Sequence, residues 1–138
     1  MKLLKRSLIL SCGVSASALV LAINAGADSF TIVNGQTVTT TQNLDTTGNV
    51  GTVEEGGVID VLTGNGIEGT ANGVTVNNAG SVTGGDSYGI FVLGESTVTN
   101  SGTATGREVI RANGDNNTIT NSGTATGNDG ILTFGDNN

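Results

Sequence analysis

Apolar and polar residues alternate over short stretches in most of the chain after residue 27. Residues 97–99 (TVT) and 118–120 (TIT) each place one β-branched apolar side chain between two threonines. This alternation is typical of a β-strand that buries one face and exposes the other to water. No helical period of 3.6 residues follows residue 27, so the pattern predicts short strands and no amphipathic helix there.

The predicted strands recur in an internal repeat. Residues 97–106 (TVTNSGTATG) and 118–127 (TITNSGTATG) differ at one position, and residues 76–84 are a looser copy. Thr-Gly pairs begin at positions 63, 83, 105 and 126, with spacings of 20, 22 and 21 residues. A fixed period of this length indicates a solenoid, and here it predicts about four rungs, where a rung is one full turn of the chain.

Within this register, residues of the same kind fall at equivalent positions, and we expect them to stack as ladders between rungs. Three columns are apolar and would form the interior. The fourth is asparagine, whose side-chain amides can bond to one another in a stack. The predicted columns are Leu62, Val82, Ala104 and Ala125; Ile67, Ile90, Ile110 and Ile131; Val76, Val98 and Ile119; and Asn78, Asn100 and Asn121.

Glycines also recur at two fixed positions of the register. We expect them at the corners of each rung, where the backbone would need a positive φ that glycine adopts without strain. The glycines in these two positions are Gly80, Gly102 and Gly123, and Gly84, Gly106 and Gly127.

Together these features predict an all-β fold, a right-handed parallel β-helix. One rung cannot bury its own apolar face, so its stability would come from its neighbours. Residues 61–138 would form the rungs, and residues 28–60, where the pattern is weaker, an N-terminal cap with irregular early rungs. The chain stops inside a repeat, as a truncated solenoid would. The alternative is a disordered fragment, because four uncapped rungs would be marginally stable.

The first 27 residues have the composition of a cleavable signal peptide with an apolar helix. Lys2, Lys5 and Arg6 precede an apolar stretch over residues 7–23, and residues 25–27 (AGA) supply the small side chains that signal peptidase requires. Two alternatives are a retained membrane anchor, which the serines in the stretch disfavour, and a lipoprotein modified at the single cysteine. After cleavage we expect no stable membrane span.

Removing that segment leaves a strongly acidic chain. It contains three of the five basic residues and none of the twelve acidic ones, so residues 28–138 carry 2 − 12 = −10. An acidic chain repels phosphate backbones, which disfavours nucleic-acid binding. The sequence has no histidine and its one cysteine lies in the first 27 residues, so we expect no catalytic triad, no metal site and no cofactor.

Carboxylates are the remaining candidates for chemistry. Asp86, Glu108 and Asp129 occupy equivalent positions and could stack like a glycosidase pair, but recurrence in successive rungs favours a solvated turn position. The glycine-rich turn around Asp86 resembles a calcium loop only loosely, and an ordinary turn is the simpler interpretation. Arg107 and Arg111 flank Glu108 and are interpreted as surface charges with weak ion pairing. Two arginines, one tyrosine and three phenylalanines are too few to predict a sugar-binding cleft.

The signal peptide and the rungs with the pattern Asn-x-Gly-(Thr/Ser)-(Ala/Val)-Thr-Gly resemble the passenger region of bacterial autotransporters and related β-helical adhesins. The matching stretches are 78–90 (NAGSVTGGDSYGI) and 121–131 (NSGTATGNDGI), while 100–110 (NSGTATGREVI) departs at Val109. The resemblance covers roughly residues 60–138 and the signal, and it implies a β-helix at the cell surface. In that family an outer-membrane β-barrel follows the passenger, so we expect a fragment that lacks the translocator.

The sequence therefore predicts a non-enzymatic structural or adhesive module, located at the cell surface, in the outer membrane or outside the cell, or in the periplasm without a translocator. Its expected partners are host or cell-surface ligands, with the Sec translocon and signal peptidase during export. The alternative is a fragment of a carbohydrate-active β-helix enzyme, a polysaccharide lyase or hydrolase.

Overall fold

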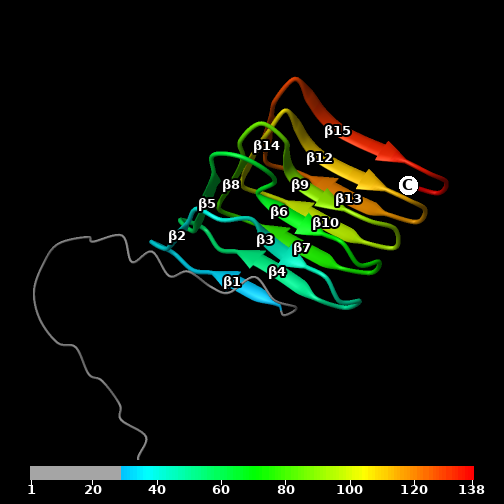
Figure 1. Cartoon of the computed structure of the whole chain (residues 1–138), viewed down its shortest axis with the longest axis horizontal. Coiled ribbons are helices and arrows are strands. Elements are labelled where there is room, and N and C mark those ends of the chain that lie inside the picture. The colour runs from blue at the N-terminus through cyan, green and yellow to red at the C-terminus, as the bar shows by residue number, and fades with distance from the viewer. Residues whose placement is uncertain (1–28) are drawn as a thin grey trace, which may run out of the picture.

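The computed structural model describes residues 29–138, and the predicted signal peptide lies outside them. Over this range the chain forms fifteen strands and no helix. The strands belong to three parallel sheets, here called A, B and C, and each rung adds one strand to each sheet (Figure 1). The result is a β-solenoid of about five turns, which confirms the predicted parallel β-helix.

Sheet A is the first face of the solenoid and has the order β1-β4-β7-β10-β13. Its strands are β1 (Phe30–Ile32), β4 (Val50–Val53), β7 (Thr75–Asn78), β10 (Thr97–Asn100) and β13 (Thr118–Asn121). The register aligns the predicted valine and isoleucine column of sheet A and the predicted asparagine column, rung upon rung.

Sheet B follows after a short corner and has the order β2-β5-β8-β11-β14. Its strands are β2 (Thr37–Val38), β5 (Val58–Val61), β8 (Ser81–Gly84), β11 (Thr103–Thr105) and β14 (Thr124–Thr126). The three strands β8, β11 and β14 pair without a break, so the repeats TATG and SVTG lie directly over each other.

Sheet C closes each rung and has the order β3-β6-β9-β12-β15. Its strands are β3 (Gln42–Leu44), β6 (Ile67–Gly69), β9 (Tyr88–Val92), β12 (Glu108–Asn113) and β15 (Asp129–Phe134). The last three are longer than most strands of sheets A and B, so sheet C offers the widest regular surface.

Aliphatic side chains stacked from rung to rung fill the interior. Ile67, Ile90, Ile110 and Ile131 form one continuous column, as predicted. The first three have no exposed surface, whereas Ile131 is 41% exposed because no described turn covers it on one side. The columns of Val76, Val98 and Ile119 and of Val82, Ala104 and Ala125 are confirmed as well.

Leu62 does not belong to the column in which the sequence placed it. Ile59 pairs with Val82 instead and is fully buried, while Leu62 lies beyond the end of β5 and is 83% exposed. The Thr-Gly pair at position 63 is therefore not equivalent to the later pairs. A corner of different length follows β5, and aligning the chain on its Thr-Gly pairs missed this shift, because Asp60 and not Thr63 pairs with Thr83.

Residues 30–61 form regular strands of the same three sheets, which adds a fifth turn to the four expected. Here Phe30 pairs with Gly51, which pairs with Val76, so one interior column contains a large side chain, none and a medium one. A Cβ on Gly51 would lie 2.6 Å from Cζ of Phe30, so the phenyl ring fills the space that glycine leaves. When side chains of different size fill one column in this way, the sequence shows no recurring residue at that position, so the repeat is not detected.

The six glycines of the register do not adopt the positive φ that was predicted for them. Positive φ occurs instead at other glycines, such as Gly35, Gly56 and Gly73. A Cβ on Gly102 would collide with the carbonyl oxygen of Gly80, and one on Gly123 with that of Gly102. These glycines are needed because successive corners approach each other too closely for any side chain.

Candidate functional site

The outer faces of the three sheets carry different side chains. On β10 and β11 the outward positions are threonines, and β13 and β14 repeat them. On sheet C the residues between the fully buried Ile90 and Val92, and between Ile110 and Ala112, point outward. The register extends them into one row along the solenoid: Asn43, Glu68, Phe91, Arg111 and Leu132.

Three aromatic rings and one guanidinium gather on this face. Tyr88 and Phe91 stack with their centroids 5.3 Å apart and their planes at 25°. The guanidinium of Arg111 lies 5.3 Å from the centroid of Tyr88 and 4.7 Å from that of Phe134. A cation at these distances is attracted by the ring quadrupoles. We call Tyr88, Phe91, Glu108, Arg111 and Phe134 the aromatic–arginine cluster.

Glu108 is the acidic member of the cluster and is held by both arginines. Its carboxylate accepts hydrogen bonds from Arg111 at 2.8 Å and from Arg107 at 3.3 Å. The side chain of Glu108 is 11% exposed, against 25% for Arg111 and 56% for Arg107. A carboxylate that is so poorly hydrated is tolerated because it is paired. The pair fixes Arg111 between the rings.

Further hydrogen bonds hold Arg111 in place from two sides. Its Nε donates to Oδ1 of Asn113 at 3.0 Å, and one Nη donates to the hydroxyl of Tyr88 at 3.4 Å. The guanidinium is thus bound at three points by groups from two adjacent strands, β9 and β12. A planar group fixed in this way loses little further freedom when a ligand binds.

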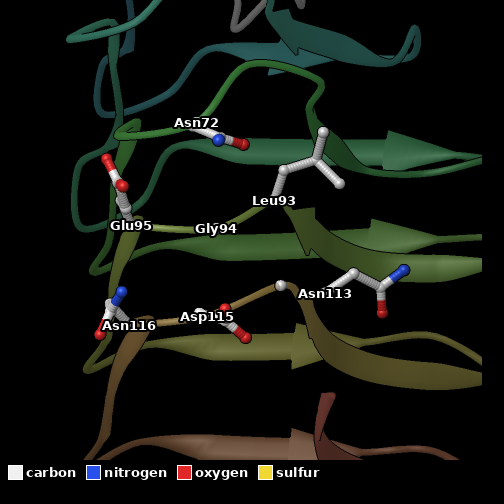
Figure 2. A pocket seen from close by; sticks show the side chains of 8 residues that line it. Asn72, Leu93, Gly94, Glu95, Asn113, Asp115 and Asn116 are labelled. Carbon is white, nitrogen blue, oxygen red and sulfur yellow. The ribbon is translucent and has the colours of Figure 1, made fainter. Parts of the chain in front are cut away.

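Asn113 also lines an open groove of about 350 Å³ at the corner between sheets C and A. Figure 2 shows that the side chains around it come from successive turns, with Asn72, Leu93 and Asp115 at different heights of the stack. Amide and carboxylate groups predominate in this lining. The groove therefore offers polar contacts directly beside the aromatic–arginine cluster.

Asparagine ladders stiffen the corners of the scaffold. Asn78 Nδ2 donates to Oδ1 of Asn100 at 2.6 Å, and Asn100 Nδ2 to Oδ1 of Asn121 at 2.7 Å. Because every amide donates toward the C-terminal side, Oδ1 of Asn78 is left buried without a partner in the described residues. Its neighbour on that side is Val53, which cannot donate from its side chain. The predicted ladder is thus confirmed, and it begins at Asn78.

The predicted acidic column is only partly correct. Glu108 pairs with Asp129, but its partner on the other side is Tyr88, not Asp86. Asp86 lies in the preceding corner, where its carboxylate accepts a hydrogen bond from Gly64 N at 3.0 Å. Glu108 is not a solvated turn residue either, because it lies within β12 and faces two arginines. Residues 29–138 contain no group of three acidic, histidine or cysteine side chains placed to hold a metal.

Sequence reasoning did not find the aromatic–arginine cluster. The signal was present, because the residues immediately after the isoleucines of the sheet C column are Phe91, Arg111 and Leu132. Reading the column one position further along would have aligned them. The repeat did not indicate that Tyr88 and Phe134 both contact the guanidinium of Arg111, because they lie at different ends of their strands.

Two further findings concern the whole described range. No helix within residues 29–138 is long and apolar enough to cross a membrane. In comparisons with protein-family models, with curated proteins and with solved structures, no match to this chain was found.

Proposed function

We propose that this chain is an exported, non-enzymatic module of the bacterial cell envelope, a β-helical passenger whose solenoid presents sheet C to a ligand. The observation that carries the proposal is the asymmetry of the outer surface. Threonine occupies the outward positions of sheets A and B in the rungs around β10 and β13, whereas aromatic rings and a fixed arginine occupy sheet C. Tyr88 and Phe91 are partly exposed and Phe134 is 48% exposed, and aromatic side chains gathered in this way on one face of a fold indicate an interaction surface.

The rigidity of the scaffold supports a role in display. Three parallel sheets join every rung to the next by backbone hydrogen bonds, and the asparagine ladders add side-chain bonds at the corners. Such a stack keeps outward residues at fixed spacings of about 4.8 Å along its axis. A binding surface with fixed spacing needs little ordering when it meets a ligand.

The charges of the cluster favour binding over catalysis. Glu108 is the least exposed carboxylate of the cluster region, and two arginines neutralise it. Both arginines occupy the carboxylate as hydrogen-bond donors, so a substrate would have to displace one of them to reach it. The sequence contains no histidine that could replace it.

A second candidate function, a carbohydrate-active enzyme, is favoured by one observation, the direct pairing of Glu108 with Asp129 on neighbouring strands. Two carboxylates flanking a sugar are the catalytic pair of most glycosidases. This alternative predicts that the chain releases reducing ends from a polysaccharide and that the variant Glu108→Gln abolishes the release. Binding without product formation would support the first proposal.

Export is tested by expressing the full chain with a C-terminal epitope tag in a Gram-negative host. The Sec translocon and signal peptidase would produce a species that begins at Asp28, which N-terminal sequencing of the secreted or periplasmic fraction would identify. A matched variant in which Ala25 and Ala27 are replaced by leucine should remain unprocessed. Recovery of the wild-type chain only in the cytoplasm, with Met1 intact, would overturn the envelope assignment.

A further inference from the structure

We propose that the aromatic–arginine cluster and the adjoining groove bind an uncharged saccharide chain. The proposal rests on the proposed display function and names the class of ligand that sheet C would take. It is carried by the side chains that the fold brings together on β9, β12 and β15, and by the balance of charge around them.

The aromatic content of the described chain is concentrated at this place. Residues 29–138 contain four aromatic side chains, of which Phe30 lies in the core. The other three, Tyr88, Phe91 and Phe134, all meet in the cluster. Phe134 is 48% exposed on β15, the last described strand, so its ring is accessible to a ligand.

The chemistry of the surface matches that of a sugar. A pyranose has an apolar face of C–H groups that packs flat against an aromatic ring, and a rim of hydroxyls that needs both donors and acceptors. The rings of Phe91 and Phe134 lie on strands two turns apart, a separation of about 9.6 Å along the solenoid axis. Arg111 supplies donors between them, and Asn72 and Asn113 supply amides in the groove beside them.

The balance of charge argues against an anionic ligand. Arg107 and Arg111 are opposed by Glu108, to which both bind, and by Asp129, which pairs with Glu108 in the register. These four formal charges cancel, whereas Glu95 and Asp115 in the groove and Glu68 beside Phe91 make the wider site net negative. The rest of residues 29–138 is strongly acidic as well. A polyanionic glycan would meet no net positive charge here and would be repelled by the remainder of the molecule. An uncharged saccharide needs no positive site and is not repelled by the acidic remainder of the molecule.

Tyrosine fluorescence provides a direct measurement, because Tyr88 is the only tyrosine and the chain has no tryptophan. The full chain would be titrated with cellohexaose, xylohexaose and mannohexaose, and with hexagalacturonate as the charged counterpart. We expect a saturable change with at least one neutral hexasaccharide, with a dissociation constant on the order of 1 mM. No saturable change with any neutral probe, or saturation with hexagalacturonate alone, would overturn the proposal.

Matched variants locate the binding surface. Phe134→Ala removes an exposed ring from the cluster, and we expect it to weaken binding roughly three- to tenfold, the loss of one aromatic contact. Val33→Ala is the control, since Val33 is 46% exposed, similar to Phe134, but lies between β1 and β2. Circular dichroism would verify that each variant folds. Equal affinity of wild type and Phe134→Ala would place the saccharide elsewhere and refute the assignment.

A second variant tests the role of the fixed guanidinium. Arg111→Lys keeps the charge but loses the planar group between the rings, so we expect weaker binding of the same hexasaccharide. Sedimentation at the same protein concentrations would detect a competing occupant, a second copy of this chain. Self-association that Phe134→Ala abolishes would show that the face is a protein interface and would overturn the saccharide proposal. Neither Arg111→Lys nor Phe134→Ala lies near the predicted cleavage site before Asp28, so the export test and the saccharide-binding test can fail separately.

Discussion

At the scale of single residues, glycine is used in this solenoid for close approach between rungs. The register glycines have ordinary φ values, yet a Cβ on Gly102 would collide with the backbone of Gly80 and Ala79 in the rung beside it. Gly130 lies on β15, also has no positive φ, and a Cβ there would meet nothing within 4 Å. Neither glycine needs a positive φ, and the two differ in how closely the backbone of another rung approaches them.

This contrast predicts different costs for the same substitution. Gly102→Ala should destabilise the fold by about 1–3 kcal/mol, because the corner must shift to admit the methyl group. Gly130→Ala should change the free energy of unfolding by less than about 0.5 kcal/mol. Urea denaturation followed by circular dichroism measures both. If both variants lowered the free energy of unfolding equally, the corners of neighbouring rungs would be able to move apart without cost, which would contradict this account.

At the scale of elements, side-chain ladders tie β7, β10 and β13 together in addition to their backbone bonds. Asn100 is fully buried, donates to Oδ1 of Asn121 and to the carbonyl of Thr124 at 3.2 Å, and accepts from Asn78. A similar arrangement joins the corners at residues 114–117 and 135–138, which share the sequence GDNN; there Asn117 N donates to Oδ1 of Asn138 at 2.8 Å. Each ladder bonds one strand or corner to the next.

Replacing the central asparagine should therefore cost more than replacing an exposed one. Asn100→Ala removes three hydrogen bonds from a buried column, and we expect a loss of about 2–4 kcal/mol in the free energy of unfolding. Asn77→Ala, at the exposed neighbouring position of β7, should cost less than about 0.5 kcal/mol. The comparison uses chemical denaturation of both variants. A neutral Asn100→Ala would show that backbone bonds alone hold sheet A together.

At the scale of the whole molecule, the solenoid must fold against its own charge. Residues 29–138 contain eleven acidic and two basic side chains, 2 − 11 = −9, and both arginines lie at one end of sheet C. The carboxylates elsewhere in the stack have no cation to offset them within the described range. Their mutual repulsion opposes the compact state.

Screening this repulsion should stabilise the fold. Between about 0.01 and 0.5 M NaCl the Debye length shortens from roughly 30 Å to a few ångströms, so the melting temperature should rise. A gain of about 1 kcal/mol corresponds to roughly 4–8 °C for a domain of this size. Thermal melts followed by circular dichroism measure the change, with KCl as the control for ion identity. A melting temperature that falls with added salt would contradict this account.

The proposed saccharide site is a property of the whole molecule, because its residues come from three different rungs. Tyr88 and Phe91 come from β9, Glu108 and Arg111 from β12, and Phe134 from β15. Stacking three rungs brings them within contact of one another. The sequence indicated that the arginines are surface charges paired with Glu108, and both ion pairs are present. It did not indicate that Arg111 also contacts the rings of Tyr88 and Phe134.

The sequence by itself determined the solenoid, its period and three of its interior columns. Those columns repeat with nearly constant spacing, and in parallel sheets equivalent residues of successive rungs lie directly over one another. The tertiary structure alone decided the place of Leu62, the regular first turn and the convergence of the cluster. Corners of unequal length shift the register, Phe30 fills the space left by Gly51, and side chains of different rungs meet only when the chain has turned back upon itself. Such contacts depend on distance in space, which a periodic pattern along the chain does not encode.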